Sequence, residues 1–263
     1  MKANVLRMFA LTLVGGTIAC RSAGTIRSAD VRPLPTAEAA LQSLRTRGAE
    51  RKTIRAAGRV TYFGDKGRVR VRMEVVAERS DRFRVATISP FEQPIDVMTC
   101  DGEQLWLLSK GALKRGPATP ANVARLLPLP LQPSEIVDTL MGGIPTGDGV
   151  SAESLTADDD GRWRLTLRRG QGQERVVLVI DPQRQVVASA AIERPAGSPY
   201  LKAVFEDFMK LDDGGFYPEK INMTMPRNNV DVRLKFKKPE LNVRLDPALF
   251  RLTPPPGRAV GAL

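Results

Sequence analysis

The sequence predicts a mainly β domain with a few helices, built as an antiparallel meander that curls into a barrel or half-barrel. Three observations support this fold class. Apolar and polar residues alternate with a period of two through most of residues 53–238. Short turns rich in Gly, Asp and Asn separate the alternating segments. A helical pattern interrupts them once, between residues 117 and 145.

The first residues have the pattern of an export signal. Lys2 and Arg7 precede the apolar stretch "MFALTLVGGTIA", and small residues precede Cys20. We expect residues 1–19 to be a signal peptide, because twelve apolar residues are too few for a membrane-spanning helix. "TIAC" fits a lipobox whose cysteine, Cys20, becomes lipidated. The alternative is an ordinary cleaved signal with a chance cysteine nearby.

The rest of the chain divides simply. We expect residues 20–35 to be a lipidated N-terminus and flexible tether, because they lack periodicity and end in two prolines. Residues 36–257 would form one domain, and residues 258–263 a C-terminal tail. We expect the protein to be a monomer.

The composition limits the function classes. The chain has 40 Lys and Arg against 29 Asp and Glu, which favours anionic partners such as anionic lipid or an acidic protein. Nucleic acid is a third kind of anionic partner, but export of the protein makes it the least suitable of the three. The chain has no histidine, so the usual general base and the commonest metal ligand are missing. With Cys20 lipidated, Cys100 would stand alone. We therefore expect no enzyme, no metal and no cofactor.

The domain should begin with a helix and a hairpin. Thr36 is a helix cap, an apolar stripe follows it, and Gly48 would end the helix. Strands are then expected at 53–63 and 68–78, joined by "GDKG". In the second strand Val69, Val71, Met73, Val75 and Ala77 share one face, which we expect to be the inner one. The opposite face carries Arg68, Arg70, Arg72 and Glu74.

The remaining strands follow the same pattern. Before the helical interruption they are expected at 82–88, 95–100 and 104–109. After it they are expected at 162–169, 174–181, 184–193, 200–211, 216–225 and 229–238, which makes about eleven strands in all. The row of arginines on the second strand, with Arg82 and Arg84 nearby, should form a basic outer surface. This surface is either a solvated strand face or a contact for an anionic partner.

The interruption predicts two short helices, at 119–127 and 133–143. Thr119 caps the first helix, Pro120 takes its first position, and Gly142 closes the second. The apolar stripe of the pair consists of Leu126, Leu127, Ile136, Val137 and Leu140.

The loop "TISPFEQP" places Phe91 among polar residues and prolines. Two prolines, Pro90 and Pro94, stiffen the loop and lower the entropy cost of holding an aromatic side chain in water. Phe91 would then meet a membrane or an apolar partner. The alternative is that Phe91 folds back and plugs one end of the barrel.

The order of these features resembles the LolA/LolB superfamily of lipoprotein carriers and receptors. The resemblance rests on the lipidated cysteine and tether, the "SPF" loop between strands, the block "LPLPLQPSEIVDTLMGGIP", and the closing "DPALFRLTPPPG". It implies an unclosed antiparallel β-barrel with an apolar concave face and a helical lid. The lid and cavity residues would be Val69, Val71, Met73 and Val75 of the inner face together with the stripe residues named above. Phe91 matches the protruding apolar loop residue of the family.

The resemblance also implies a function. The chain would be anchored in the outer membrane, facing the periplasm, and would bind the acyl chains of lipidated cargo. It would exchange cargo with a LolA-type periplasmic carrier and help to place lipoproteins in the outer membrane. The alternative is a lipid-anchored structural or sensing module that has the same fold and transfers no cargo.

Overall fold

The computed structural model describes most of the expected domain. The signal segment, Cys20 and most of the tether lie outside the described residues, as does Leu126. Described are residues 34–64, 67–79, 81–124, 127, 131–143, 149–170, 173–193, 199–254, 257 and 259–263. Within them, no helix combines the length and the apolar character that crossing a bilayer requires.

The strands form one sheet of fourteen within the described residues. The first group consists of β1 (Thr53–Gly64), β2 (Gly67–Glu78), β3 (Arg82–Ile88), β4 (Pro94–Asp101), β5 (Gln104–Ser109) and β6 (Ala112–Pro117). The second consists of β7 (Ser151–Ala157), β8 (Trp163–Arg169), β9 (Glu174–Asp181), β10 (Val186–Glu193), β11 (Pro199–Lys210), β12 (Phe216–Met225) and β13 (Val230–Leu241). The last strand is β14 (Gly261–Ala262).

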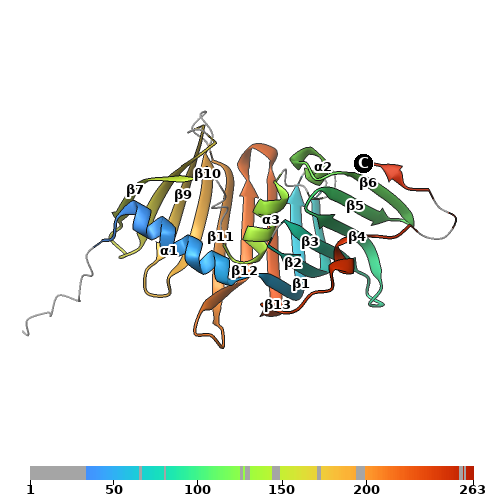
Figure 1. The fold of residues 1–263 in the computed structure, drawn as a ribbon, viewed down its shortest axis with the longest axis horizontal. Helices are drawn as coiled ribbons and strands as arrows, with labels where there is room; N and C mark the ends of the chain where they lie inside the picture. Colours follow the sequence, from blue (N-terminus) through green and yellow to red (C-terminus); the bar gives the residue numbers. More distant parts are fainter. Residues whose placement is uncertain are drawn as a thin grey trace, which may run out of the picture. The chain divides into compact units, whose positions relative to one another are not determined.

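The topology is that of two meanders joined at the centre of the sheet. The strand order is β14-β6-β5-β4-β3-β2-β1-β13-β12-β11-β10-β9-β8-β7 (Figure 1). All the neighbours are antiparallel except β14, which lies parallel to β6. Because β14 and β7 stand at opposite ends of this order, the sheet does not close. The expected unclosed antiparallel sheet is therefore confirmed.

Three of the fourteen described strands, β6, β7 and β14, were not among the eleven that the sequence predicted. β6 and β7 were overlooked because "ALKRGP" contains Gly and Pro, and "SAESLTA" is mostly polar and largely exposed. β14 lies in the expected C-terminal tail, yet its two residues pair with Lys114 and Arg115 of β6. The two-residue alternation predicted the longer, half-buried strands correctly.

Three α-helices accompany the sheet in the described part of the chain: α1 (Ala37–Glu50), α2 (Pro120–Ala124) and α3 (Pro133–Leu140). The side chain of Thr36 accepts a hydrogen bond from Ala39 N–H, as expected of a cap. Gly48 does not end α1, which continues to Glu50, and Arg51 N–H donates to the Gly48 carbonyl. Two short 3₁₀ segments, η1 (Pro226–Asn228) and η2 (Pro247–Phe250), flank β13.

The hydrophobic core lies on the face of the sheet that carries α1 and α3, here called the inner face (Figure 1). Ala40 and Leu41 of α1 and Val137 of α3 belong to the same buried cluster as the inward residues of the strands. That cluster extends from Leu105 on β5 to Leu165 on β8 and is continuous across the join between β1 and β13. The opposite face is called the outer face below.

Candidate functional site: the inner face, its helix and the Phe91 loop

The inner face carries most of the expected cavity residues. Met73 and Val75 of β2 are buried in the cluster. Val71 is half-buried, whereas Val69 is 50% exposed. The alternation along β2 was therefore predicted correctly from Val71 onward, whereas the inner position expected for Val69 is wrong. Burial fades toward the β1–β2 turn, because Val69 lies in the part of β2 that runs beyond its pairing with β3.

Helix α3 lies against β2 and β3 with its apolar stripe turned to the sheet. Ile136, Val137 and Leu140 are buried, and Leu127 is half-buried against the same cluster. The stripe therefore covers part of the inner face. Whether it moves as a lid stays a prediction.

Polar contacts fix both ends of α3. Asp138 accepts a hydrogen bond from Arg79 at 2.6 Å, and Glu135 forms an ion pair with Arg169 at 2.6 Å. The hydroxyl of Tyr217 donates to the carbonyl of Leu140. Burial raises the pKa of Asp138 and outweighs the attraction of Arg79. These contacts connect α3 to the residue after β2 and to β8 and β12, which are far apart in sequence.

Arg51 joins the end of α1 to the end of α3. Its guanidinium donates to the carbonyls of Met141 at 2.9 Å and Phe216 at 2.6 Å, and lies 6.0 Å from the centre of the Tyr217 ring. Burial lowers the pKa of Arg51 against the opposing attraction of Tyr217. Gly142 fits here for two reasons. Its φ is +69°, which favours glycine, and a Cβ atom would stand 2.7 Å from Pro218. Sequence reasoning predicted Gly142 but not Arg51 or Tyr217, since neither belongs to a recognisable motif.

A cleft of about 680 Å³ opens between the second half of α1, the end of α3 and the ends of β9, β10 and β12. Its apolar lining includes Leu44, Met141, Leu178, Val186 and Val187. Its rim carries Arg47, Arg51, Arg79, Arg184 and Asp213. A volume of this size lies in the range of small-molecule sites in proteins. The cleft therefore lies beside α3, at the margin of the apolar inner face.

Phe91 stands in water. Its side chain is 86% exposed, so the alternative in which it plugs the barrel is wrong. The hydroxyl of Ser89 accepts hydrogen bonds from the N–H groups of Phe91 at 3.2 Å and Gln93 at 3.1 Å. Glu92 has a φ of +62° and forms an ion pair with Arg72 at 3.1 Å. Phe91 is thus presented by a hydrogen-bonded turn.

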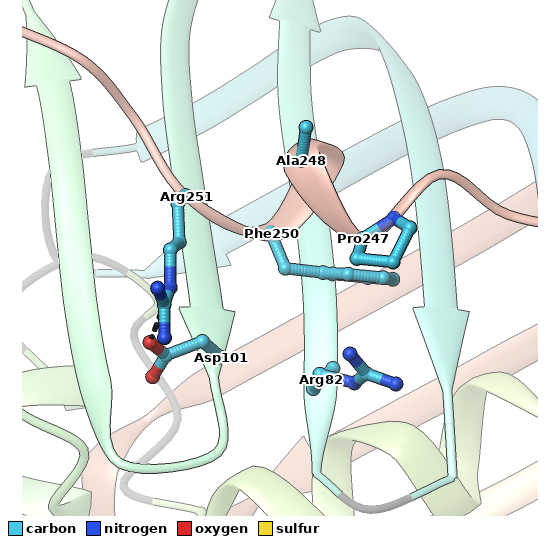
Figure 2. A pocket seen from close by; sticks show the side chains of 6 residues that line it. All are labelled: Arg82, Asp101, Pro247, Ala248, Phe250 and Arg251. Atoms are coloured by element: carbon cyan, nitrogen blue, oxygen red, sulfur yellow. Dashed lines mark hydrogen bonds and ion pairs between the residues drawn. The ribbon is translucent and has the colours of Figure 1, made fainter.

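A second, smaller pocket of about 370 Å³ lies on the outer face, beneath η2. Figure 2 shows the Phe250 ring beside the guanidinium of Arg82, and Arg251 directed at Asp101. The guanidinium lies 5.3 Å from the ring centre, and Arg251 Nε lies 3.1 Å from the Asp101 carboxylate. Phe250 is buried outside the main cluster. These contacts attach the C-terminal segment to β3 and β4.

No family model and no curated protein sequence matches the chain. Solved structures do match. A LolA superfamily protein from Nitrosomonas europaea aligns with a TM-score of 0.61 and 14% identity, over 83% of this chain and 98% of that protein. The chain has a LolA/LolB-like fold.

Two further structures agree with this fold. A DUF1329 family protein from Desulfovibrio piger aligns with a TM-score of 0.59 and 13% identity, over 82% of this chain and 98% of that one. A putative outer membrane lipoprotein-sorting protein domain from Vibrio parahaemolyticus aligns with a TM-score of 0.56 and 10% identity, over 80% and 95%. In this LolA/LolB-like fold, the inner face with α3 and the cleft beside it form the candidate site.

Proposed function

We propose that the chain binds the acyl chains of lipidated cargo against its inner face and helps to place lipoproteins in the outer membrane. Lipidation of Cys20 would anchor it there, facing the periplasm. The observation that carries the proposal is the apolar inner face of a LolA/LolB-like sheet, reached through an open cleft of about 680 Å³. One solved structure with this fold is described as a lipoprotein-sorting domain, which supports the same role.

The energetics of an acyl chain explain why a carrier is needed. Each methylene removed from water contributes about 0.8 kcal/mol, so a palmitoyl chain is worth roughly 12 kcal/mol. A protein that accepts such a chain must offer comparable apolar surface and also give it up. The cleft is lined in part by Leu44, Leu178 and Val187, and it is not fully enclosed. It therefore offers apolar contact without full enclosure.

Phe91 is the proposed point of exchange. Its exposed ring would enter either the headgroup boundary of the membrane or the apolar mouth of a LolA-type carrier. Full burial of the ring in such a contact is worth about 1.5–3 kcal/mol. Ile95, which follows in β4, is 51% exposed and would extend the same contact.

The polar contacts of α3 favour a second candidate function. Asp138 and Glu135 tie α3 to the sheet, and its stripe already packs in the core. A chain with a fixed helix over a filled inner face would be a lipid-anchored structural or sensing module. It would transfer no cargo.

Binding of a fluorescent palmitate analogue and of a palmitoylated peptide decides between the two. The protein would be the full chain with Cys20→Ala, so that its own acylation does not interfere. Leu44→Trp should fill the cleft and weaken binding at least tenfold. Leu249→Trp is the matched control, because Leu249 is also half-buried and lines a cleft, but on the outer face. Absence of saturable binding by the parent chain would leave the structural module.

A further inference from the structure

Four cations stand side by side across the centre of the outer face. Lys220 of β12 pairs with Lys235 of β13, Lys235 with Arg59 of β1, and Arg59 with Arg72 of β2. Residues directly opposite each other in antiparallel strands have their Cβ atoms about 5 Å apart. The row therefore places four basic residues directly opposite one another on neighbouring strands.

This arrangement costs stability, because like charges directly opposite one another repel. Only the ends of the row are neutralised by described residues. Lys220 forms an ion pair with Asp207 at 2.5 Å, and Arg72 forms one with Glu92. Arg59 and Lys235, at the centre, are exposed and have no ion pair with any described residue. Because these charges do not stabilise the fold, the row indicates binding to an anionic partner.

Basic residues continue toward the β1–β2 turn, where Arg233 forms an ion pair with Asp231 at 3.0 Å. Next to the row on the outer face are Arg70 of β2 and Arg233 of β13, which both lie opposite Thr61 of β1. Arg233 and Arg68 lie over the Phe63 ring at 5.0 and 5.4 Å from its centre. We call the surface made by Arg59, Arg68, Arg70, Arg72, Arg233 and Lys235 the outer plate.

The plate adjoins the exposed apolar loop. Arg72 lies opposite Ile88, the last residue before that loop, and its guanidinium contacts Glu92, the residue after Phe91. Cations beside an exposed aromatic tip are the combination that proteins use to bind anionic membrane surfaces. An acidic protein partner would satisfy the charges but would leave the adjoining Phe91 unexplained.

We propose that the outer plate binds the phosphate-bearing headgroups of an anionic membrane, as a contact separate from the Phe91 tip. The inference rests on the proposed function for the choice of a membrane as partner. Because the plate lies on the face opposite α1 and α3, headgroup binding leaves the inner face and its cleft free. The plate would hold the molecule at the surface while the Phe91 loop enters it.

Binding to vesicles tests the plate. In the Cys20→Ala chain, Arg59→Gln with Lys235→Gln removes the two central charges. Each basic residue near an anionic surface changes partitioning by about fivefold, so the pair should weaken binding to vesicles containing phosphatidylglycerol about 25-fold at low salt. The parent chain and the variant should both bind weakly, and to the same extent, to vesicles of phosphatidylcholine alone. High salt should remove the difference. The melting temperature should stay the same or rise, because repulsion is relieved.

The control is Arg164→Gln with Arg244→Gln, which removes two exposed cations outside the plate. An equal loss of vesicle binding in the control would overturn the proposal, since it would reflect net charge alone. So would undiminished vesicle binding by the plate variant, or binding of a soluble acidic protein or polyanion without vesicle binding. Palmitate binding is measured in the same variants and should not change. Its absence in all of them would count against the proposed function and not against the plate.

Discussion

At the scale of single residues, Ser89 determines where Phe91 stands. The hydroxyl of Ser89 accepts two backbone hydrogen bonds, and the Ser89 carbonyl accepts a third from Glu92 N–H at 3.0 Å. The aromatic ring makes no contribution to the core, because it is 86% exposed. The turn is therefore stable without its aromatic residue, and the ring can be changed without loss of the fold.

Phe91→Glu should leave the melting temperature nearly unchanged and abolish delivery of a lipoprotein to membranes. The ring has little buried surface to lose, whereas a carboxylate at the tip opposes entry into an apolar contact. Leu34→Glu is the control, because Leu34 is also exposed, at 41%, and lies elsewhere. A large drop in melting temperature, or delivery at the parental rate, would contradict the role given to this loop.

Cys100 is a core residue of β4. It is completely buried, and burial raises the pKa of its thiol to about 11, against a hydrogen bond from Gly102 N–H. We expect the thiol to resist a disulfide reagent at neutral pH in the native protein and to react once urea unfolds the chain. Thiol titration of the Cys20→Ala chain measures this directly. Rapid reaction of the native protein would show that β4 opens locally.

At the scale of elements, the sequence predicted the strands whose two faces differ. β9 and the part of β2 from Val71 onward alternate cleanly, because one face meets the core and the other meets water. β7 gives no such signal, since most of its side chains are exposed. The candidate site was predicted only where it is apolar. Arg51, Arg79 and Tyr217 were missed, because their partners are backbone carbonyls or side chains distant in sequence.

The contact between Arg79 and Asp138 should stabilise the docking of α3. The two side chains are 32% and 15% exposed, so removal of Arg79 leaves a poorly solvated carboxylate. We expect Arg79→Met to cost about 2 kcal/mol in urea unfolding, less than for a fully buried pair. Adding Asp138→Leu should recover part of the loss. A double-mutant cycle measures the coupling, and additive losses would show that the pair contributes nothing.

Hydrogen exchange distinguishes a movable α3 from a fixed one. If α3 opens to admit an acyl chain and closes over it, exchange of the amides of residues 134–140 should slow when palmitate binds. The amides of β9 provide the comparison, because they lie within the sheet. Exchange that is the same with and without palmitate would support the fixed helix of the structural module.

At the scale of the whole domain, one core connects the two meanders. The buried cluster runs from β5 through β1 and β13 to β8 without interruption. The two tryptophans report on opposite halves, since Trp106 lies in β5 and Trp163 in β8. Because the halves share this core, we expect them to unfold together.

The single-tryptophan variants Trp106→Phe and Trp163→Phe test this expectation. Each variant leaves one fluorescent reporter, in β8 and β5 respectively. After correction for the stability change of each substitution by circular dichroism, the fluorescence and circular dichroism midpoints in urea should coincide in both variants. Separate midpoints would mean that the meanders behave as independent folding units.

The pairing of β1 with β13 has a consequence for how the chain is made. Val60 of β1 pairs with Leu234 of β13, so an early strand must wait for one of the last to be synthesised. Contacts so distant in sequence form slowly. During that wait, one edge of β1 stays bare, and a bare edge is a template for pairing with another chain. In the nascent protein, β1 is thus the strand most exposed to aggregation, although it lies at the centre of the native sheet. Substitutions that delay β13 would lower the yield of folded protein while leaving its final stability unchanged.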